Sequence, residues 1–223
     1  PSEFEDFICE WAFFFLQKHT SDYTRVVRYG GSGDLGRDIV GYVDDSSTPP
    51  ICDVYQCKHY AHPLRPAEFW PELAKLCYFT FRNELPMPRR YRVVAPQDVG
   101  PDLGRLLDDP SALKDRLVRE WLNNDKITPL SRKITSQTQV ILTGPLREHV
   151  DRFPFSIVGH KPIHDVISEH RQTIRYPARF GGGLTRPVPA DKAPPSVPAS
   201  SETRYVEQLL HAYRDHTKTA DIT

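Results

Sequence analysis

Apolar residues recur along the chain at two spacings, one typical of helices and one typical of strands. In residues 3–19 (EFEDFICEWAFFFLQKH), the spacing of Phe4, Phe7, Ile8 and Trp11 predicts an amphipathic helix. The same kind of pattern predicts helices over 65–84, 101–124 and 163–172. Short apolar runs bounded by turn residues predict strands over 23–29, 38–43, 51–58, 90–95 and 138–142.

The order of these elements predicts an α/β fold. We expect residues 1–180 to form one domain with a mixed central sheet flanked by helices. Residues 181–201 are rich in Pro, Ala and Ser, which is typical of an extended linker. Residues 202–223 include a short amphipathic helix that cannot bury its apolar stripe alone. We expect this helix to dock on the main domain or on a partner, or to begin a further region.

Composition limits the classes of function. The 223 residues carry a formal net charge of zero, so a role with nucleic acid would need a local basic face. The densest basic run, Arg89 to Arg92, is either a phosphate contact or a charged strand edge. The four cysteines form no CxxC pair, which argues against a zinc module and favours the reducing cytoplasm. The apolar run over 13–16 is too short to span a bilayer, and we expect no membrane segment.

The strands over 38–43 and 51–58 flank a turn cluster, DDSSTPP, and predict a hairpin. A symmetric register centred near residue 47 places Asp38 opposite Gln56, with the two Cβ atoms about 5 Å apart. Gln56 and Lys58 are two residues apart and therefore share a face of the strand. An acid, an amide and an ammonium group on one buried face are costly unless they pair or bind an ion. The alternative is a solvated strand face with a surface salt bridge.

The three side chains are suited to a magnesium ion, which prefers oxygen ligands. We expect the Asp38 carboxylate, the Gln56 side-chain oxygen and the backbone carbonyl of Cys57 to be ligands, with Mn²⁺ as the alternative metal. Lys58 would place a positive charge beside the ion, where it can stabilise a phosphate transition state. The pattern therefore predicts phosphodiester hydrolysis.

These residues also resemble a known family. The sequence GDLGRDI at Gly33 to Ile39, followed by VYQCK at Val54 to Lys58, resembles the Mrr-like branch of the PD-(D/E)xK restriction endonuclease superfamily. The resemblance implies a restriction-endonuclease-like core, with Asp38, Gln56 and Lys58 at the motif positions. A glutamine in place of the second acid is common in that branch.

The resemblance extends to the first helix and to the loop before Asp38. It implies a helical glutamate as a further metal ligand; Glu5 fits the F-E opening, and Glu10 is the alternative. We expect Gly33, Gly36 and Arg37 to contact DNA, because glycines let a phosphate backbone approach closely.

The resemblance implies a metal-dependent deoxyribonuclease that cleaves double-stranded DNA in prokaryotic defence or restriction. It further implies a homo-oligomer, or a larger defence complex that assembles through the C-terminal region. Two alternatives remain open. One is a nuclease fold without catalysis that serves DNA binding or assembly, and the other is a protein-interaction domain that depends on the terminal helix.

Overall fold

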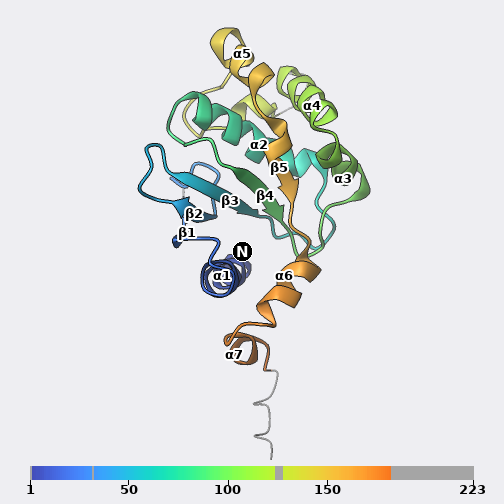
Figure 1. The fold of residues 1–223 in the computed structure, drawn as a ribbon. Helices are drawn as coiled ribbons and strands as arrows, with labels where there is room; N and C mark the ends of the chain where they lie inside the picture. The colour runs from blue at the N-terminus through green and yellow to red at the C-terminus, as the bar shows by residue number, and fades with distance from the viewer. Residues whose placement is uncertain (1, 32, 124–127, 182–223) are drawn as a thin grey trace, which may run out of the picture. The chain divides into compact units, whose positions relative to one another are not determined.

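The computed structural model describes residues 2–31, 33–123 and 128–181. The predicted helix over 202–223 and all but the first residue of the predicted linker over 181–201 lie outside this part of the chain. The described residues form a mixed sheet flanked by helices, so the predicted α/β fold is confirmed (Figure 1). No helix within the described ranges is long and apolar enough to cross a membrane.

The sheet has five strands in the order β1-β2-β3-β4-β5. The first three strands are antiparallel neighbours, whereas β4 runs parallel to both β3 and β5. Their bounds are β1 (Arg25–Arg28), β2 (Ile39–Asp44), β3 (Ile51–Cys57), β4 (Arg90–Val94) and β5 (Val158–His160). Ile39 lies opposite Tyr55 and Val40 opposite Val54, so the predicted hairpin register centred on residue 47 is confirmed.

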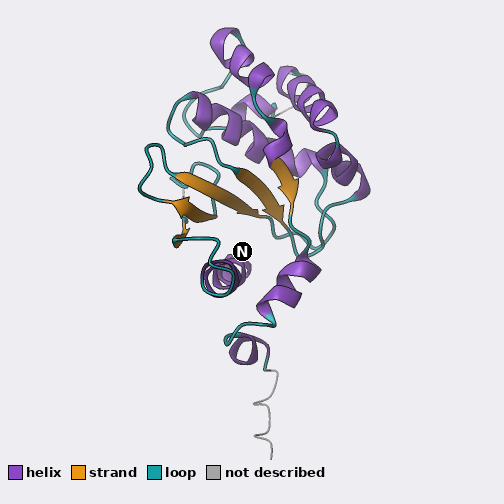
Figure 2. Ribbon diagram, in the orientation of Figure 1, coloured by secondary structure: helices purple, strands orange, loops and turns teal. Residues whose placement is uncertain are grey.

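Helices cover both faces of the sheet, which gives three layers (Figure 2). One face carries α2 (Pro66–Phe81), α3 (Pro101–Asp108), α4 (Pro110–Leu122) and α5 (Gly144–Arg152). The other carries α1 (Ser2–Trp11), α6 (Ile163–His170) and α7 (Tyr176–Phe180). Three short segments complete the described elements: the π-helical η1 (Ala12–Gln17) and the 3-10 turns η2 (Leu130–Arg132) and η3 (Phe155–Ile157).

Each face of the sheet has its own apolar core, because successive side chains of a strand point to opposite faces. Val40, Val54 and Tyr91 pack in the core under α2, whereas Ile39 and Tyr55 pack in the core under α1. The alternation also separates Cys52 from Cys57, which lie in different cores as their spacing of five predicts. All four cysteines are free.

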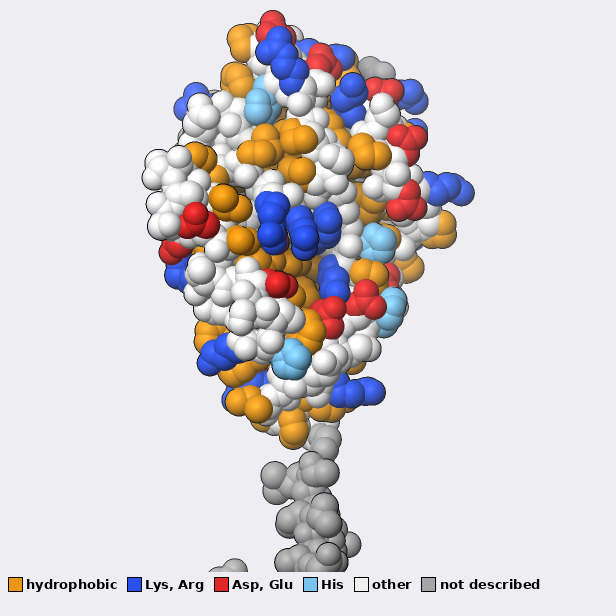
Figure 3. Space-filling view, in the orientation of Figure 1, with side chains coloured by type: hydrophobic (Ala, Val, Ile, Leu, Met, Phe, Trp, Pro, Cys, Tyr) orange, Lys and Arg blue, Asp and Glu red, His pale blue; other side chains and the backbone are white. Residues whose placement is uncertain are grey.

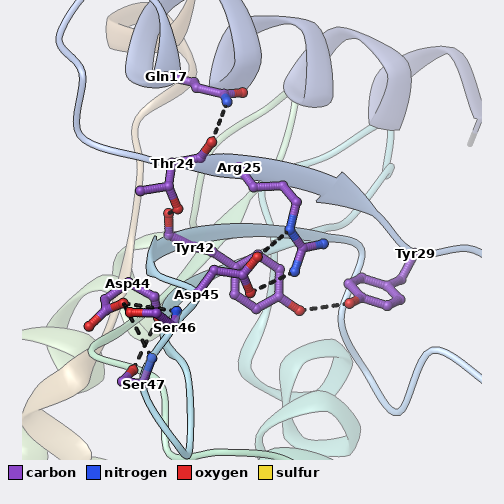
Figure 4. Close-up of polar contacts among 9 residues, drawn as sticks. All are labelled: Gln17, Thr24, Arg25, Tyr29, Tyr42, Asp44, Asp45, Ser46 and Ser47. Carbon is purple, nitrogen blue, oxygen red and sulfur yellow. Dashed lines mark hydrogen bonds and ion pairs between the residues drawn. The ribbon is translucent and has the colours of Figure 1, made fainter.

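The turn between β2 and β3 is closed by its own polar side chains (Figure 4). Asp44 Oδ1 accepts hydrogen bonds from the Ser46 amide (2.9 Å), the Ser46 hydroxyl (2.6 Å) and the Ser47 amide (3.3 Å). Arg25 donates two hydrogen bonds of 2.8 Å to Asp45, which ties β1 to the turn. These contacts fix the hairpin, and the hairpin fixes which residues oppose each other at its far end.

The predicted strand over 138–142 is wrong. The Val140 amide donates to the Ser131 carbonyl (2.8 Å), and the Val140 carbonyl accepts from the Trp121 indole (2.9 Å). The segment buries Val140 and Leu142 and exposes Ile141, but its backbone is bonded to the η2 turn and to a side chain instead of to a strand. The fifth strand is Val158–His160, in a run too short to be recognised by periodicity.

Two predicted helices are divided, and two helices, α5 and the five-residue α7, were not predicted. The helix over 101–124 breaks at Asp109, because Pro110 has no amide hydrogen and the Asp109 side chain caps α4 through the amides of Ser111 and Ala112 (3.0 Å each). The helix over 3–19 widens to a π-helix after Trp11. Helix α5 lies in a polar segment with little apolar periodicity.

Replacing Gly41 with alanine should destabilise the fold. A Cβ at this position in β2 would lie 2.4 Å from the buried Tyr23 ring, whose hydroxyl bonds Asp53 (2.9 Å) and Tyr55 (2.7 Å). We expect Gly41→Ala to lower the free energy of unfolding by about 1–3 kcal/mol, measured by urea denaturation. Gly30→Ala is the control, since its Cβ would meet no atom within 4 Å. Equal stability of the Gly41→Ala protein and the wild type would contradict this packing.

Candidate functional site

Three polar side chains meet at the end of the sheet where β2 begins and β3 ends. Asp38 immediately precedes β2, Gln56 lies near the end of β3, and Lys58 follows that strand. The hairpin register continues by one pair to oppose Asp38 and Gln56, and Gln56 Nε2 donates to Asp38 Oδ2 at 2.6 Å. All three positions alternate with the core residues under α1, so they face the layer of α2.

The Asp38 carboxyl is buried and held by two donors. Its Oδ2 atom accepts from Gln56 Nε2 and from the Cys57 amide, both at 2.6 Å, and the residue is 8% exposed. Burial raises the pKa of Asp38 to about 7; the Cys57 amide opposes this shift, and the nearby Glu5 carboxylate adds to it. The group therefore changes charge near neutral pH, and a cation bound beside it would favour the ionised form.

Two oxygens at this end of the sheet are available to a cation. The hydrogen bonds that the Asp38 side chain accepts from Gln56 and Cys57 both go to Oδ2, which leaves Oδ1 outside them. Gln56 Oε1 is buried and has no hydrogen-bond partner within the described part of the chain. A buried amide oxygen without a donor is costly, and an ion that prefers oxygen would satisfy it. The donor set fits Mg²⁺.

The other predicted metal ligands are the Cys57 carbonyl and a helical glutamate. Cys57 contributes its amide hydrogen to Asp38, and ligation by its carbonyl stays a prediction. Among the described residues, no three His, Cys, Asp or Glu side chains are grouped so that they could hold a metal. Of the groups that line the candidate site, we consider the carboxyl groups of Asp38 and Glu5 and the amide of Gln56 as ligands.

Lys58 is held by an acid that the sequence analysis missed. Its Nζ donates to Glu72 Oε1 on α2 at 2.7 Å, and Lys75 Nζ lies 3.2 Å from Glu72 Oε2. Glu72 is buried, which raises its pKa, but the charges of Lys58 and Lys75 outweigh burial and lower the pKa overall. A glutamate between the core residues Trp70 and Leu73 was the available signal, because a charge on a buried helix face requires a partner.

The two alternative helical acids occupy different environments. Glu5 lines a cavity of about 370 Å³ together with Asp38, Gln56 and Lys58, and its Oε2 accepts from Arg28 at 2.8 Å. Glu10 lies 2.6 Å from the fully buried His170 and has no part in that cavity. The structure thus brings Glu5 to the candidate site and leaves Glu10 in a structural ion pair.

Part of the glycine loop before β2 packs against α2. Gly36 has a positive φ of 80°, and a Cβ there would lie 3.3 Å from the Lys75 side chain, so the loop packs directly on α2. Gly33 has open space around it. Arg37 stacks over the Tyr29 ring at 4.4 Å and does not line the cavity, whereas Asp34 does. DNA contact by Gly33, Gly36 and Arg37 stays a prediction.

Comparisons of this chain with protein-family models, with curated proteins and with solved structures found no match.

Asp38→Asn should stabilise the metal-free protein in a pH-dependent way. The folded-state pKa of about 7 exceeds the ordinary value of 3.8, so ionised Asp38 lowers stability as the pH rises between these values. The asparagine variant should therefore be more stable than the wild type at pH 8, by at most about 4 kcal/mol, and the difference should shrink towards pH 4. Thermal unfolding of both proteins in EDTA between pH 4 and pH 8 measures this difference in stability. Mg²⁺ should stabilise the wild type and not the variant, and a difference that does not vary with pH would contradict the assignment.

Proposed function

We propose that this chain is a metal-dependent deoxyribonuclease of the PD-(D/E)xK kind, with Mg²⁺ or Mn²⁺ as cofactor. The observation that carries the proposal is the convergence of Asp38, Gln56 and Lys58 at one end of the hairpin, with Gln56 Oε1 buried and unpaired among the described residues. A structural salt bridge accounts for Lys58 alone, but not for an orphaned amide oxygen beside a carboxyl of raised pKa.

Each side chain has a separate role in phosphodiester hydrolysis. Asp38 and Gln56 hold the cation through oxygen atoms, and Glu5 contributes a second carboxylate directly or through water. When bound, Mg²⁺ supplies Lewis acidity and a water of lowered pKa. Lys58 places its ammonium group at the same cavity, where it offsets the negative charge that develops on the phosphate during in-line attack.

The pairing of Lys58 with Glu72 is compatible with that role. Glu72 is shared between Lys58 and Lys75, so the three side chains together keep one positive charge. The short contact to Glu72 also fixes the direction of the Lys58 side chain, which is 18% exposed. A preorganised ammonium group needs no reorientation during the reaction.

The substrate we propose is double-stranded DNA. One such cavity cuts one strand, so cleavage of a duplex requires two copies, and we propose a homo-oligomer or a larger defence complex that assembles through the C-terminal region. The free cysteines fit a role in the cytoplasm. The second candidate is a nuclease fold that binds DNA without cutting it; the replacement of an acid by Gln56 favours this reading, since it lowers the negative charge available to a metal.

Asp38→Ala and Lys58→Ala should each lower Mg²⁺-dependent cleavage of plasmid DNA by about 100-fold or more. The first change removes a ligand of the metal, and the second removes the ammonium group that offsets charge on the reacting phosphate. The measurement is the rate of plasmid nicking by the full chain, with and without Mg²⁺. Lys161→Ala is the matched control. Its ammonium group pairs with Glu169 at 2.6 Å outside the cavity, so this variant loses an equivalent ion pair and should retain cleavage.

Undiminished cutting by the purified Asp38→Ala protein would refute the assignment. Calorimetry with Mg²⁺ separates the two candidate functions. A nuclease should bind the ion in a manner abolished by Asp38→Ala, whereas a module that only binds DNA should show no such binding.

The two helical acids should give opposite results. Glu5→Ala should lower cleavage by about 10- to 100-fold, because Glu5 lines the cavity and its loss weakens metal binding. Glu10→Ala should lower the free energy of unfolding by about 1–3 kcal/mol, because it leaves the buried His170 without its acceptor. The cleavage rates of the two variants are compared at a temperature where both are folded. Greater loss of cleavage in Glu10→Ala than in Glu5→Ala would reverse the assignment.

A further inference from the structure

A second cavity, of about 660 Å³, adjoins the candidate site and is lined by basic and hydroxyl side chains. It lies between the end of α2, the loop before β2 and the segment that follows η2. We call it the basic groove. Its cations are Lys75, Arg82, Arg132 and Lys133, and its acids are Asp34 and Glu84. The lining therefore carries four positive and two negative charges.

The cations on the η2 side of the groove are free to bind a ligand. Lys75 pairs with Glu72, and Arg82 pairs with Glu84. Within the described ranges, by contrast, the exposed side chains of Arg132 and Lys133 form no ion pair or hydrogen bond. The Ser136 hydroxyl and the Gln137 amide line the same groove and can donate to phosphate oxygens, whereas the Thr135 hydroxyl donates to the Thr138 carbonyl at 2.8 Å.

The basic groove and the candidate site form one continuous surface with divided charge. Asp34 and Lys75 line both cavities. The candidate site carries four carboxyl groups against two lysines, which suits a cation, whereas the groove carries the excess of positive charge. The face drawn in Figure 3 has Lys and Arg side chains gathered at its centre and acidic side chains below them.

We propose that the basic groove binds the phosphate backbone of duplex DNA and leads one strand to the candidate site. This inference rests on the proposed function for the identity of the polyanion. A chain of zero net charge has no global field to attract DNA, so affinity must come from a local set of unpaired cations. Arg132 and Lys133 supply that set, and Ser136 and Gln137 beside them supply neutral donors.

Two of the three arginines in the basic run that stands out in the sequence have internal partners. Arg89 donates two hydrogen bonds to the buried Asp53, at 2.6 and 2.9 Å. Arg92 donates to the carbonyl of Ile157 at 2.7 Å. Both guanidinium groups are committed to internal partners.

The test is binding of the full chain to a fluorescein-labelled DNA duplex in EDTA, where a metal-dependent enzyme does not cut, followed by anisotropy over a range of salt concentrations. The Arg132→Ala/Lys133→Ala double variant should bind about tenfold more weakly or worse at low salt. It should also reduce the slope of log K against log salt by about 2, since each phosphate contact contributes about 0.9.

Two controls separate the groove from general charge effects. Arg105→Ala/Lys114→Ala removes the same charge from α3 and α4, outside the groove, and should change the affinity by no more than about twofold. Arg132→Lys/Lys133→Arg keeps both charges and should bind as the wild type does. Unchanged thermal unfolding of the alanine double variant shows that its fold is intact, as the exposure of both side chains leads us to expect.

The proposal is overturned if the alanine double variant keeps the wild-type affinity and salt slope, or if the wild type binds no duplex DNA. Tighter binding of an RNA duplex of the same sequence would also overturn the assignment to DNA. Failure of the nuclease proposal has a different signature. If the wild type binds DNA through Arg132 and Lys133 but never cuts it with Mg²⁺ or Mn²⁺, the proposed DNA binding by the basic groove is supported and the proposed nuclease activity is refuted.

Discussion

The burial of the Asp38 carboxyl between two strand ends is the constraint on which the candidate site depends. A carboxyl group loses its hydration when it is buried, and among the described residues two donors replace that hydration, the Gln56 amide and the Cys57 backbone amide. This partial compensation is why the pKa of Asp38 rises to about 7. A buried carboxyl group with so few donors is unfavourable in the metal-free protein, and we expect it where a bound cation replaces the lost hydration. The unpaired Gln56 Oε1 atom beside it also points to a bound cation.

Much of this arrangement could be predicted from the sequence, because it follows from local rules. A turn centred on residue 47 and the two-residue period of a strand are enough to oppose Asp38 with Gln56 and to place Lys58 on the same face. The three layers follow from the order of helices and strands. The choice between Glu5 and Glu10 could not be made in this way, since both flank the apolar stripe of α1 and only tertiary packing separates them.

What could not be predicted depends on contacts between distant segments. Glu72 could be identified as a buried charge, but its pairing with Lys58 depends on how α2 crosses the sheet. The segment over 138–142 has the alternation of a strand, yet its backbone bonds are taken by Ser131 and Trp121. The basic groove could not be predicted for the same reason, because α2, the glycine loop and η2 are far apart in sequence. In the more conspicuous basic run, Arg89 is paired with Asp53 and Arg92 is bonded to the Ile157 carbonyl.

Lys75 gives the two cavities a physical connection. Its ammonium group pairs with Glu72 at the candidate site, and the residue also lines the basic groove. Lys75 therefore interacts with charged groups of both cavities. A phosphate in the groove would compete with Glu72 for Lys75, and Glu72 would then be left to pair with Lys58 alone. The ammonium group of Lys58 would be held more firmly once the polyanion is in place. In this arrangement Gly36 keeps the loop close enough for the two cavities to share that lysine, because its φ of 80° disfavours a side chain and a Cβ there would lie 3.3 Å from Lys75.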